Sequence, residues 1–579
     1  MLSKFSVRID RDVPVPVRDG TVLCGDIYRP GDRKKHPALL LRTPYGKIPM
    51  AEHDCSLINK FVQAGYAVIY QDVRGRYASA GIYDSADAFL TQEGPDGFDS
   101  VEWVAAQPWC DGAVGTFGGS YMARLQWMLG KENPPHLKAM APSISSDTPA
   151  SQAPLWYGTI ALIMATSSAA TVGMGMAEKL ESEGKDASRM RKMLNQAINE
   201  PMEVLNFLPL KDIPHFDFPG LKEVWYNRGL KALPPPEQAG NIYWQYEKVT
   251  VPCLYQSGWY DFNLRGSLAN YLNMKKRGGS QLTRRNQYLL IGPWSHGIMP
   301  SSLGNINFGP AADALGGHIA EHYIAYFDKY LRGIDSEIPA VRYFIMGENA
   351  WHTADGWPLP QTQWRRYFLH SRGRANSSAG NGILTRDEPS DDIPDKFIYD
   401  PHSPVLTAGG PWASGNGFVP GPLDQGHNER REGVLCYTTP ELKEDLQVTG
   451  PLSLHLFAAT SARDTDFTAK LVDVCPDGRS YNVAEGIVRA RFRKSVFTTE
   501  LLTPGEVIEY TIDLVGASQL FRRGHRIRLD VTSSNFPAFD RNMNTGNPTG
   551  EDKRGLVATQ SVFHQAGYAS YIDLPVITE

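Results

Sequence analysis

The chain contains little cysteine. Its 579 residues include six cysteines, at positions 24, 55, 110, 253, 436 and 475. They form no CxxC pair and no dense framework, which argues against a zinc ribbon and against a small disulfide-stabilised fold. Scattered cysteines in a chain of this size are typical of a reducing compartment, so we expect a cytoplasmic protein.

Long apolar runs are also missing. The first residues include Lys4, Arg8 and Asp10 and contain no apolar run, so the start of the sequence shows no secretory signal. Residues 148–177 carry no charge but are rich in Ser, Thr, Gly and Ala. A membrane-spanning helix needs about 20 predominantly apolar residues. We therefore expect buried helices in this stretch and no membrane association.

Neither sign of charge dominates. Lys and Arg total 58 and Asp and Glu total 63, which gives a formal net charge of −5. This balance provides no electrostatic attraction for nucleic acid or for an anionic membrane. The 42% hydrophobic content allows large cores, and the length is sufficient for two or three domains. We expect a globular protein with no nucleic-acid partner.

Several cofactor and metal motifs are absent from the sequence. It has no HExxH, no clustered Cys and His with metal-ligand spacing, and no GxxxxGK[ST] loop. Gly173-Met-Gly175 follows no strand pattern and lacks a third glycine, so it does not predict a dinucleotide site. We expect neither a metal nor a cofactor.

Short apolar runs bounded by turn residues predict a mostly parallel β-sheet. Such runs, buried on both faces, are typical of parallel strands, and helix-patterned stretches such as 99–106 and 316–331 lie between them. The runs are Ala38–Leu41, Tyr66–Tyr70, Val114–Phe117, Leu137–Ala141, Val251–Tyr255, Gln287–Ile291 and Val341–Met346. Before them, Pro14 and Pro16 place a β-hairpin at the sheet edge. This alternation indicates an α/β domain.

Two changes of pattern divide the chain. Residues 148–247 become helical in composition before the strand pattern resumes, which indicates a cap inserted into the α/β domain. After about residue 355, short alternating strands and frequent turns indicate an antiparallel sandwich or jelly roll. We expect a catalytic domain at 1–147 and 248–354, a helical cap at 148–247 and an all-β domain at 355–579.

The sharpest local motif is Gly118-Gly119-Ser120, which lies between a predicted strand and a helix pattern. A nucleophile elbow has this arrangement, because a serine in a tight turn points its hydroxyl over the sheet edge. The N–H of Tyr121 would then face the developing oxyanion. Met122 replaces the last glycine of the usual G-x-S-x-G pattern. An ordinary Gly-Ser turn that opens a helix is the alternative.

Two later strand ends provide the partners that a serine nucleophile needs. Asp261 follows the strand that begins at Val251, and His296 follows the strand that begins at Gln287. The chain order Ser, Asp, His is that of α/β-hydrolases, in which the carboxylate orients the histidine base. Each residue alone could be a cap or a loop residue, but the three positions together predict a catalytic triad.

A group of longer motifs supports this interpretation. They are Arg42-Thr-Pro-Tyr45, Asp72–Gly81, Gly118-Gly-Ser-Tyr121, Gly258-Trp-Tyr-Asp261, Gly292-Pro-Trp-Ser-His296, Gly524–Leu529 and Ser534–Asn542. Together they resemble the cocaine esterase (CocE/NonD) family, within the X-prolyl dipeptidyl-peptidase-like serine hydrolases. The resemblance covers nearly the whole chain and is weakest at 148–247. It implies an α/β-hydrolase domain with a helical cap and a C-terminal jelly roll.

The resemblance also implies roles for particular residues. Ser120 would be the nucleophile, Asp261 the orienting acid and His296 the base. Tyr45 would donate its phenol to the oxyanion beside the Tyr121 N–H; a packed loop tyrosine is the alternative. Substrate contacts are expected, with core packing as the alternative, from four aromatic residues: Trp156, Trp259, Phe262 and Trp412. The Asp72–Arg76 segment is interpreted as structural, with its arginines joining loops to carboxylates.

These residues predict a serine hydrolase that cleaves a small-molecule ester, or an amide, through an acyl-enzyme. The resemblance to α-amino-acid ester hydrolases implies that acids after the catalytic Asp would hold a substrate ammonium. Here Asp261 is followed by Phe262-Asn263-Leu264-Arg265, which contains no acid, so we expect uncharged hydrophobic or aromatic acyl groups. An X-Pro dipeptidyl peptidase and an α-amino-acid ester hydrolase or acyltransferase are alternatives on the same scaffold. A non-catalytic ligand-binding protein is the alternative from another class, and a homodimer stays open.

Overall fold

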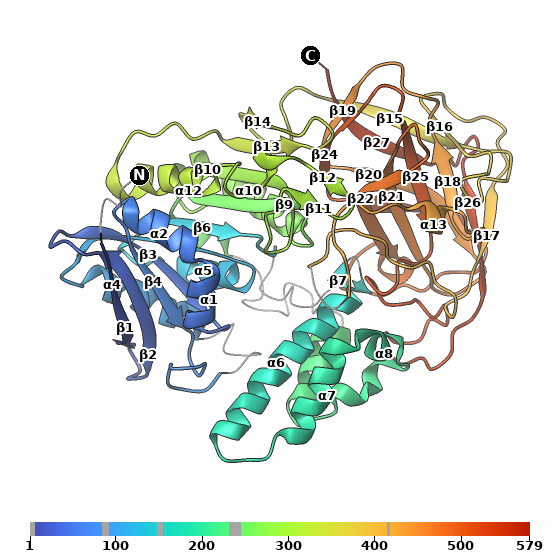
Figure 1. Ribbon diagram of the computed structural model, residues 1–579. Helices are drawn as coiled ribbons and strands as arrows, with labels where there is room; N and C mark the ends of the chain where they lie inside the picture. The colour runs from blue at the N-terminus through green and yellow to red at the C-terminus, as the bar shows by residue number, and fades with distance from the viewer. Residues whose placement is uncertain are drawn as a thin grey trace.

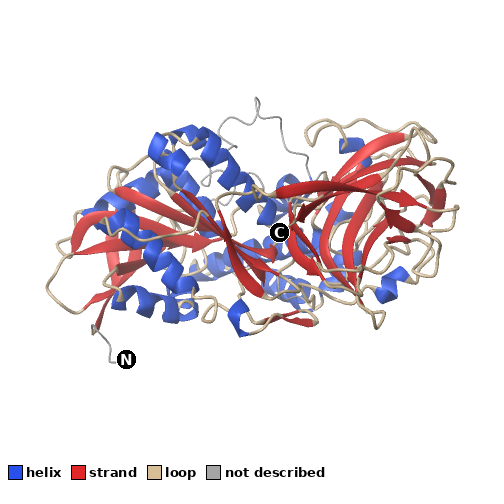
Figure 2. Cartoon of the chain, turned by 90° about the horizontal axis from the view of Figure 1, so that it is seen from above, coloured by secondary structure: helices blue, strands red, loops and turns tan. Residues whose placement is uncertain are grey.

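The computed structural model describes residues 6–83, 92–147, 155–156, 158–230, 245–413 and 417–578. Figure 1 shows a sheet with flanking helices built mainly from the first part of the chain and a second β-rich body built from the last part. A group of helices, α6 to α8, lies between and below these two bodies. Seen from above, strands run from one end of the molecule to its middle, and the β-rich body occupies the other end (Figure 2).

The first sheet has ten strands in the order β1-β2-β4-β3-β5-β6-β9-β10-β13-β14. The run from β4 to β13 is parallel, whereas β1, β2 and β14 pair antiparallel at the edges. The strands are β1 (Val7–Pro16), β2 (Val22–Pro30), β3 (His36–Thr43), β4 (Ala67–Asp72), β5 (Cys110–Gly119), β6 (Leu137–Ser143), β9 (Cys253–Tyr260), β10 (Gln287–Ser295), β13 (Val341–Ile345) and β14 (Ala350–Ala354). The apolar runs therefore form parallel strands, and the proline-containing β1 lies at the edge, as predicted.

Helices connect these strands. They are α1 (Lys47–His53), α2 (Cys55–Gln63), α4 (Glu93–Ala105), α5 (Tyr121–Lys131), α10 (Leu264–Arg277), α11 (Gln281–Arg285) and α12 (Ile319–Phe327), which continues into a π-helical turn at Asp328–Arg332. Most of the helix pattern at 99–106 lies in α4, and most of that at 316–331 lies in α12 and its π-helical turn. Strands β3 and β4 are buried along their whole length, which explains why their sequence shows no alternation.

A helical segment leaves the sheet after β6 and returns before β9. It contains α6 (Leu162–Ser182), α7 (Ser188–Asn199), α8 (Pro201–Asn206) and α9 (Leu221–Val224) around a core of its own. A Cβ added at Gly173 would lie 2.8 Å from Leu194 and 2.9 Å from Leu221. This glycine therefore allows helices to pack closely. None of the helices in the described ranges is long and apolar enough to cross a membrane.

The C-terminal body is all-β, and most of its strand pairs are antiparallel. Its strands are β15 (Thr362–His370), β16 (Ile383–Thr385), β17 (Asp395–Tyr399), β18 (Leu435–Thr438), β19 (Leu446–Gly450), β20 (Ser453–Thr460), β21 (Asp466–Val474), β22 (Ser480–Arg489), β23 (Ile508–Asp513), β24 (Ala517–Phe521), β25 (Arg526–Thr532), β26 (Ala558–Phe563) and β27 (Tyr571–Ile577). The structure thus has the predicted fold class, an α/β domain with inserted helices and a C-terminal all-β domain.

The three domain limits expected from the sequence fall at different places relative to the helices and strands. The limit at 354/355 falls between β14 and β15. The limit at 247/248 falls inside the turn Tyr246–Lys248, which packs with the α/β domain. There the Tyr246 ring lies 5.6 Å from the Trp127 ring, and its hydroxyl donates to Asn270 at 2.7 Å. The limit at 147/148 lies at the edge of the described residues.

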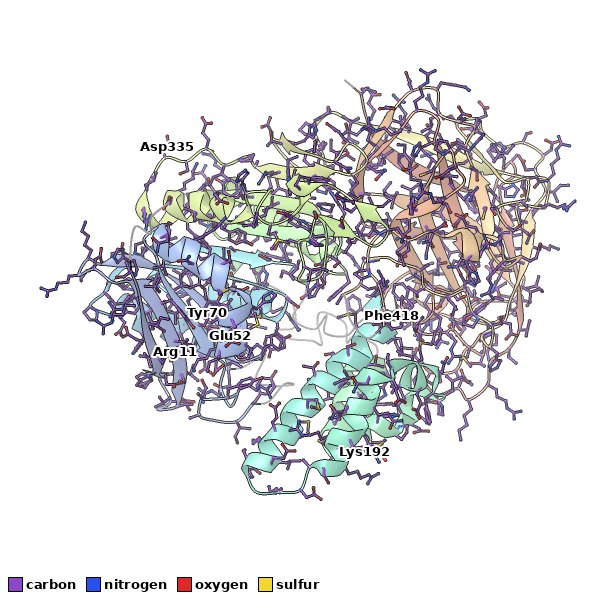
Figure 3. The ribbon with its side chains drawn as sticks, in the orientation of Figure 1. Arg11, Glu52, Tyr70, Lys192, Asp335 and Phe418 are labelled. Atoms are coloured by element: carbon purple, nitrogen blue, oxygen red, sulfur yellow. The ribbon has the colours of Figure 1, made fainter. Side chains whose placement is uncertain are left out.

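Backbone contacts join the three parts close to the ends of the sheet strands. The Met346 N–H donates to the Ser518 carbonyl at 3.0 Å, and His296 forms a β-bridge with Ala413. The N–H of Ile160, at the base of the helical segment, donates to Asp540 at 2.8 Å. Phe418, labelled in Figure 3, packs against the core of the helical segment and against a second cluster that contains β-domain residues.

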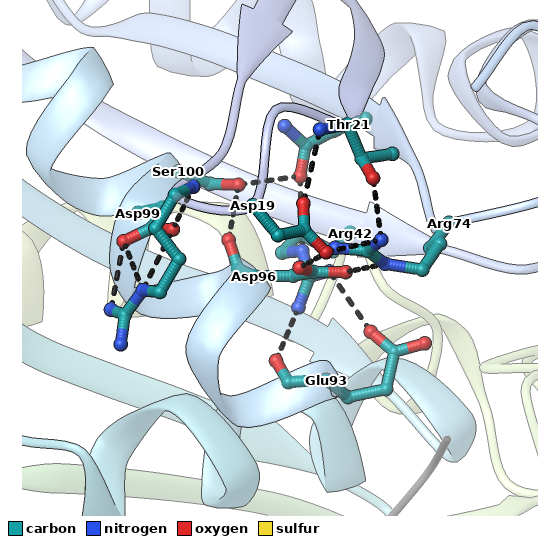
Figure 4. A network of polar contacts seen from close by, with 10 residues as sticks. Asp19, Thr21, Arg42, Arg74, Glu93, Asp96, Asp99 and Ser100 are labelled. Atoms are coloured by element: carbon teal, nitrogen blue, oxygen red, sulfur yellow. Dashed lines mark hydrogen bonds and ion pairs between the residues drawn. The ribbon is translucent and has the colours of Figure 1, made fainter. Parts of the chain in front are cut away.

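Arg42, near the end of β3, and Arg74, in the loop after β4, take part in one polar network (Figure 4). Arg42 donates to the Glu93 carboxylate at 2.9 Å. Arg74 pairs with Asp96 at 2.6 Å and with Asp19 at 2.8 Å. Such multiply bonded arginines hold loops in one conformation. Arg74 therefore acts as the sequence predicts for the Asp72–Arg76 segment, by joining loops to carboxylates.

Candidate active site

Ser120 occupies the turn between β5 and α5. Its backbone has φ 58° and ψ −118°, a conformation that is strained for a residue with a side chain. The Ser120 N–H donates to the Ser143 carbonyl at 3.0 Å, so the neighbouring strand end holds the turn in place. A strained serine between a strand and a helix is the geometry of a nucleophile elbow.

The glycines before Ser120 let this turn close. A Cβ added at Gly118 would lie 2.8 Å from the Cβ of Met122, and one at Gly119 would lie 2.8 Å from Ile144. Residues 118 and 122 therefore face each other across the turn, and only one of them can carry a side chain. Because Gly118 supplies the space, the elbow tolerates Met122 where the usual pattern has glycine.

The structure brings His296 and Asp261 to Ser120. His296 Nε2 lies 2.9 Å from Ser120 Oγ, and His296 Nδ1 lies 3.1 Å from each carboxylate oxygen of Asp261. Asp261 is buried and accepts a second hydrogen bond, from the N–H of Asn263 at 2.6 Å. The buried carboxylate can hold the imidazole in one orientation, and Nε2 can accept the serine proton.

Phe262 lies against the imidazole rather than in a separate pocket. Its ring stacks on that of His296, with 4.0 Å between the centroids and 28° between the planes. The next residue, Asn263, donates its side-chain amide to the Ile144 carbonyl at 2.9 Å. This segment after Asp261 therefore restrains the histidine, and substrate contact by Phe262 remains a prediction.

Tyr45 and Tyr121, expected around the oxyanion, lie side by side. Their ring centroids are 6.1 Å apart in an edge-to-face arrangement. Tyr121 is the first residue of α5, where helix N–H groups point out of the helix. Burial of the phenol raises the pKa of Tyr45 to about 12, although 38% of the whole residue is accessible. The hydroxyl therefore stays protonated and can donate over a wide pH range.

Arg76 supports the Tyr45 loop, a role that was missed in the sequence. Its Nε donates to the Pro44 carbonyl at 3.0 Å, one residue before Tyr45. A Cβ added at Gly175 of α6 would overlap the Arg76 guanidinium, so α6 packs directly on this side chain. The Asp72–Arg76 motif provided the signal, but the spacing does not reveal which partner each arginine has.

Two of the expected pocket tryptophans lie in cores. Trp259 is 3% exposed and donates its indole N–H to the Phe344 carbonyl at 2.8 Å. Trp412 is 1% exposed and packs edge-to-face on Phe539. Both side chains stabilise junctions between elements, so core packing is the interpretation that their surroundings favour. Trp156 belongs to the short strand β7 (Leu155–Trp156), and its side chain is outside the described residues.

A cavity of about 380 Å³ opens beside Ser120 and His296. Its walls come from β5, from α1 and α2, and from the segment between His296 and Tyr323. Among the described residues, its lining does not include Trp259, Phe262 or Trp412. Sequence reasoning missed these walls, because α2 and α12 are far apart in the chain and carry no recognisable motif.

The mostly parallel sheet, the strained serine at a strand–helix turn and the all-β C-terminal domain define an α/β-hydrolase-type enzyme with an added β-domain. Comparisons with family models also give a catalytic and a C-terminal part, although the second model begins before β13 and β14 of the first sheet. Residues 19–298 match the X-Pro dipeptidyl-peptidase (S15 family), and residues 333–573 match the X-Pro dipeptidyl-peptidase C-terminal non-catalytic domain.

The chain is 34% identical to the cocaine esterase of Rhodococcus sp. (strain MB1 Bresler), with 98% of each chain covered. It therefore belongs to the cocaine esterase family of S15-type serine hydrolases, which confirms the resemblance noted in the sequence.

Solved structures show the same architecture. An aminopeptidase from a marine sediment Thaumarchaeota archaeon is 25% identical with a TM-score of 0.77, covering 99% of this chain and 97% of its own. An α-amino acid ester hydrolase is 24% identical with a TM-score of 0.73 and the same coverage. A CocE/NonD family hydrolase from Staphylococcus aureus is 18% identical with a TM-score of 0.67, covering 99% of this chain and 94% of its own. The last two support the fold alone.

Proposed function

We propose that this protein cleaves carboxylic esters of small molecules through an acyl-enzyme formed on Ser120. The observation that carries the proposal is the contact of His296 Nε2 with Ser120 Oγ at 2.9 Å, while Nδ1 of the same ring faces the buried Asp261. A serine hydroxyl becomes an effective nucleophile only when a base removes its proton. The three residues satisfy that requirement in one connected hydrogen-bonded chain.

The proposed reaction has two halves. His296 accepts the proton of Ser120 as Oγ attacks the ester carbonyl, and it then gives that proton to the leaving alcohol. A water molecule attacks the acyl-enzyme in the second half, with His296 again acting as base and then as acid. The Tyr45 hydroxyl and the Tyr121 N–H donate to the oxyanion of both tetrahedral intermediates. Asp261 stabilises the imidazolium that forms in each half.

Labelling with a fluorophosphonate probe tests the proposal. The wild-type enzyme should react at Ser120 in a one-to-one ratio, and Ser120→Ala should not react. A matched control is Ser295→Ala, because Ser295 lines the same cavity and should leave labelling intact. A protein that stays unlabelled, or labelling that survives Ser120→Ala, would favour the non-catalytic binding alternative.

We expect a preference for uncharged hydrophobic or aromatic acyl groups over α-amino acyl groups. The segment that follows Asp261 supplies Phe262 and Arg265 but no carboxylate near the reacting carbonyl. An ammonium on the α-carbon would therefore lose its hydration without gaining a counter-ion. The phenylacetyl ester should show a kcat/KM about tenfold above that of the phenylglycyl ester of the same alcohol.

A tenfold preference for the phenylglycyl ester would overturn this expectation and favour the α-amino-acid ester hydrolase alternative. Dipeptidyl X-Pro anilides belong in the same substrate panel, because their hydrolysis would favour the peptidase alternative. Adding an amine acceptor would reveal acyl transfer as a product that forms in place of the free acid.

Activity should depend on pH in one direction only. The rate should rise with pH, because only a neutral imidazole can accept a proton from Ser120. An ordinary tyrosine titrates near 10, whereas the raised pKa of Tyr45, about 12, keeps its hydroxyl a donor at that pH. We therefore expect kcat to stay level to about pH 10.5.

Initial rates measured from pH 5 to 10.5, with circular dichroism as a check of folding, provide the test. A fall in kcat centred near pH 10 that disappears in Tyr45→Phe would show that the phenol ionises in the ordinary range.

A further inference from the structure

The C-terminal β-domain lies directly behind the acid of the proposed triad. A small cavity of about 20 Å³ lies at this contact between the two domains. Tyr260 and Asp261 line it from the end of β9, and Asn482 and Glu485 line it from β22. All four residues are buried. The acid therefore borders the β-domain with little space between them.

Tyr260 joins the segment of the acid to this β-domain. Its hydroxyl donates to the backbone carbonyl of Asn482 at 3.0 Å, and both groups are buried. Tyr260 is the last residue of β9 and directly precedes Asp261 in the chain. Burial raises the pKa of the Tyr260 phenol, so the hydroxyl remains a donor. The bond to Asn482 thus restrains the backbone from which the Asp261 carboxylate reaches His296.

The base is restrained from the same side. Tyr260 pairs with Ser295 in the parallel register of β9 and β10, so the acid and the base each follow one of two paired residues. His296 itself forms a parallel β-bridge with Ala413, which belongs to the C-terminal part of the chain. The β-domain therefore contacts the backbone at or next to both partners of the serine.

The side chain of Asn482 holds the backbone on both sides of Ala413. Its Oδ1 accepts from the N–H of Leu423 at 2.8 Å, and its Nδ2 donates to the Gly421 carbonyl at 3.3 Å. Gly421 in turn exchanges two backbone hydrogen bonds of 2.9 Å with Gly410, three residues before Ala413. Asn482 thus reaches the acid through its carbonyl and the base through its side chain.

We propose that Asn482 and Tyr260 are positioning residues of the triad, through which the β-domain sets the place of the acid relative to the base. His296 Nδ1 lies 3.1 Å from both oxygens of Asp261, so a small shift of either partner would lengthen this contact. Misplacement of a catalytic group by about 1 Å can cost up to a factor of about 100 in rate. The inference rests on the proposed esterase function and adds the residues that hold its triad in place.

Tyr260→Phe is the decisive variant, because it keeps the buried ring and removes only the bond to the Asn482 carbonyl. It should lower kcat about tenfold and change KM less than about twofold, since the acid acts on the reaction and not on substrate binding. Asn482→Ala removes the side-chain bonds but keeps the carbonyl that accepts from Tyr260. It should lower kcat by a similar factor. Steady-state kinetics on one activated aryl ester measures both.

Tyr399→Phe is the matched control. Tyr399 is a buried tyrosine of the β-domain whose hydroxyl also donates to a backbone carbonyl at 3.0 Å, that of Asn542. Its loss removes a comparable bond away from the acid and the base. This variant should leave kcat and KM unchanged, and thermal unfolding of all variants shows what each bond contributes to stability.

A double-mutant cycle separates positioning from a general effect on the fold. In Asp261→Ala no carboxylate remains to be positioned, so adding Tyr260→Phe should slow the residual reaction less than about twofold. A residue that only supported the fold would lower the rate by the same factor in both backgrounds.

Two outcomes would overturn the proposal. Unchanged kcat in Tyr260→Phe or in Asn482→Ala would remove the role assigned to that residue, and Tyr260→Phe decides the acid side even if Asn482→Ala does not fold. An equal loss from Tyr260→Phe in the wild-type and Asp261→Ala backgrounds would show a purely structural role. Both differ from failure of the esterase function itself, in which the wild-type protein hydrolyses no ester and Ser120 is not labelled.

Discussion

Ser120→Ala should lower kcat by on the order of 10⁴ or more, with the protein still folded. The alanine keeps the backbone of the elbow but removes the atom that attacks the carbonyl. What remains is catalysis by the oxyanion donors and by substrate binding, which is small next to covalent catalysis. Initial rates on an activated aryl ester measure the effect, and thermal unfolding checks that the variant retains its structure.

His296→Ala should cause a loss of similar size, and the double variant should be about as slow as either single one. The reason is the 2.9 Å contact between His296 Nε2 and Ser120 Oγ: each group has a catalytic role only through the other. His322→Ala is a suitable control, because His322 is a partly buried histidine of the same domain outside the cavity lining. A double variant much slower than both single variants would contradict a single catalytic unit.

Tyr45→Phe should lower kcat by roughly 10²–10³ while KM changes little. The phenol would donate to charge that develops only as the tetrahedral intermediate forms, so its loss raises the barrier without weakening ground-state binding. The phenylalanine keeps the edge-to-face contact with Tyr121, which limits any change in the shape of the loop. Steady-state kinetics on one ester separates the two parameters.

Tyr226→Phe is the matched control, since it removes an exposed phenol from the helical segment. It should leave both parameters unchanged. If Tyr45→Phe raised KM and left kcat intact, Tyr45 would bind substrate without stabilising the transition state. Loss of activity in both tyrosine variants would instead indicate a general effect on folding.

The sequence predicted the strands of the α/β domain well because most of them are short, buried on both faces and bounded by turns. Chain order and strand ends then placed Ser120, Asp261 and His296 at the same edge of the sheet. The structure brings these three within hydrogen-bonding distance. Along the chain, Asp261 lies 35 residues before His296 and Ser120 lies 176 residues before it. A parallel sheet aligns its carboxyl ends, so the distance along the chain does not matter.

The sequence did not show which aromatic residues contact the substrate and which lie in the core. Trp259 belongs to β9, which is buried along its whole length, so alternation could not tell which face each side chain occupies. Its neighbour Asp261 faces the histidine, whereas the Trp259 indole bonds to the Phe344 carbonyl. The sequence could not predict the environment of Trp412 either, because that environment depends on the contact between the β-domain and the helical segment.

The sequence by itself determined the order of the elements, the elbow at Ser120 and the succession of acid and base. These features depend on local pattern and on strand ends, and both can be read along one dimension. Only the tertiary structure decided which side chains form the cavity and where Arg76 finds its partners. Pro44 and Gly175 reach Arg76 through packing of distant elements, and packing is determined by shape and burial in three dimensions.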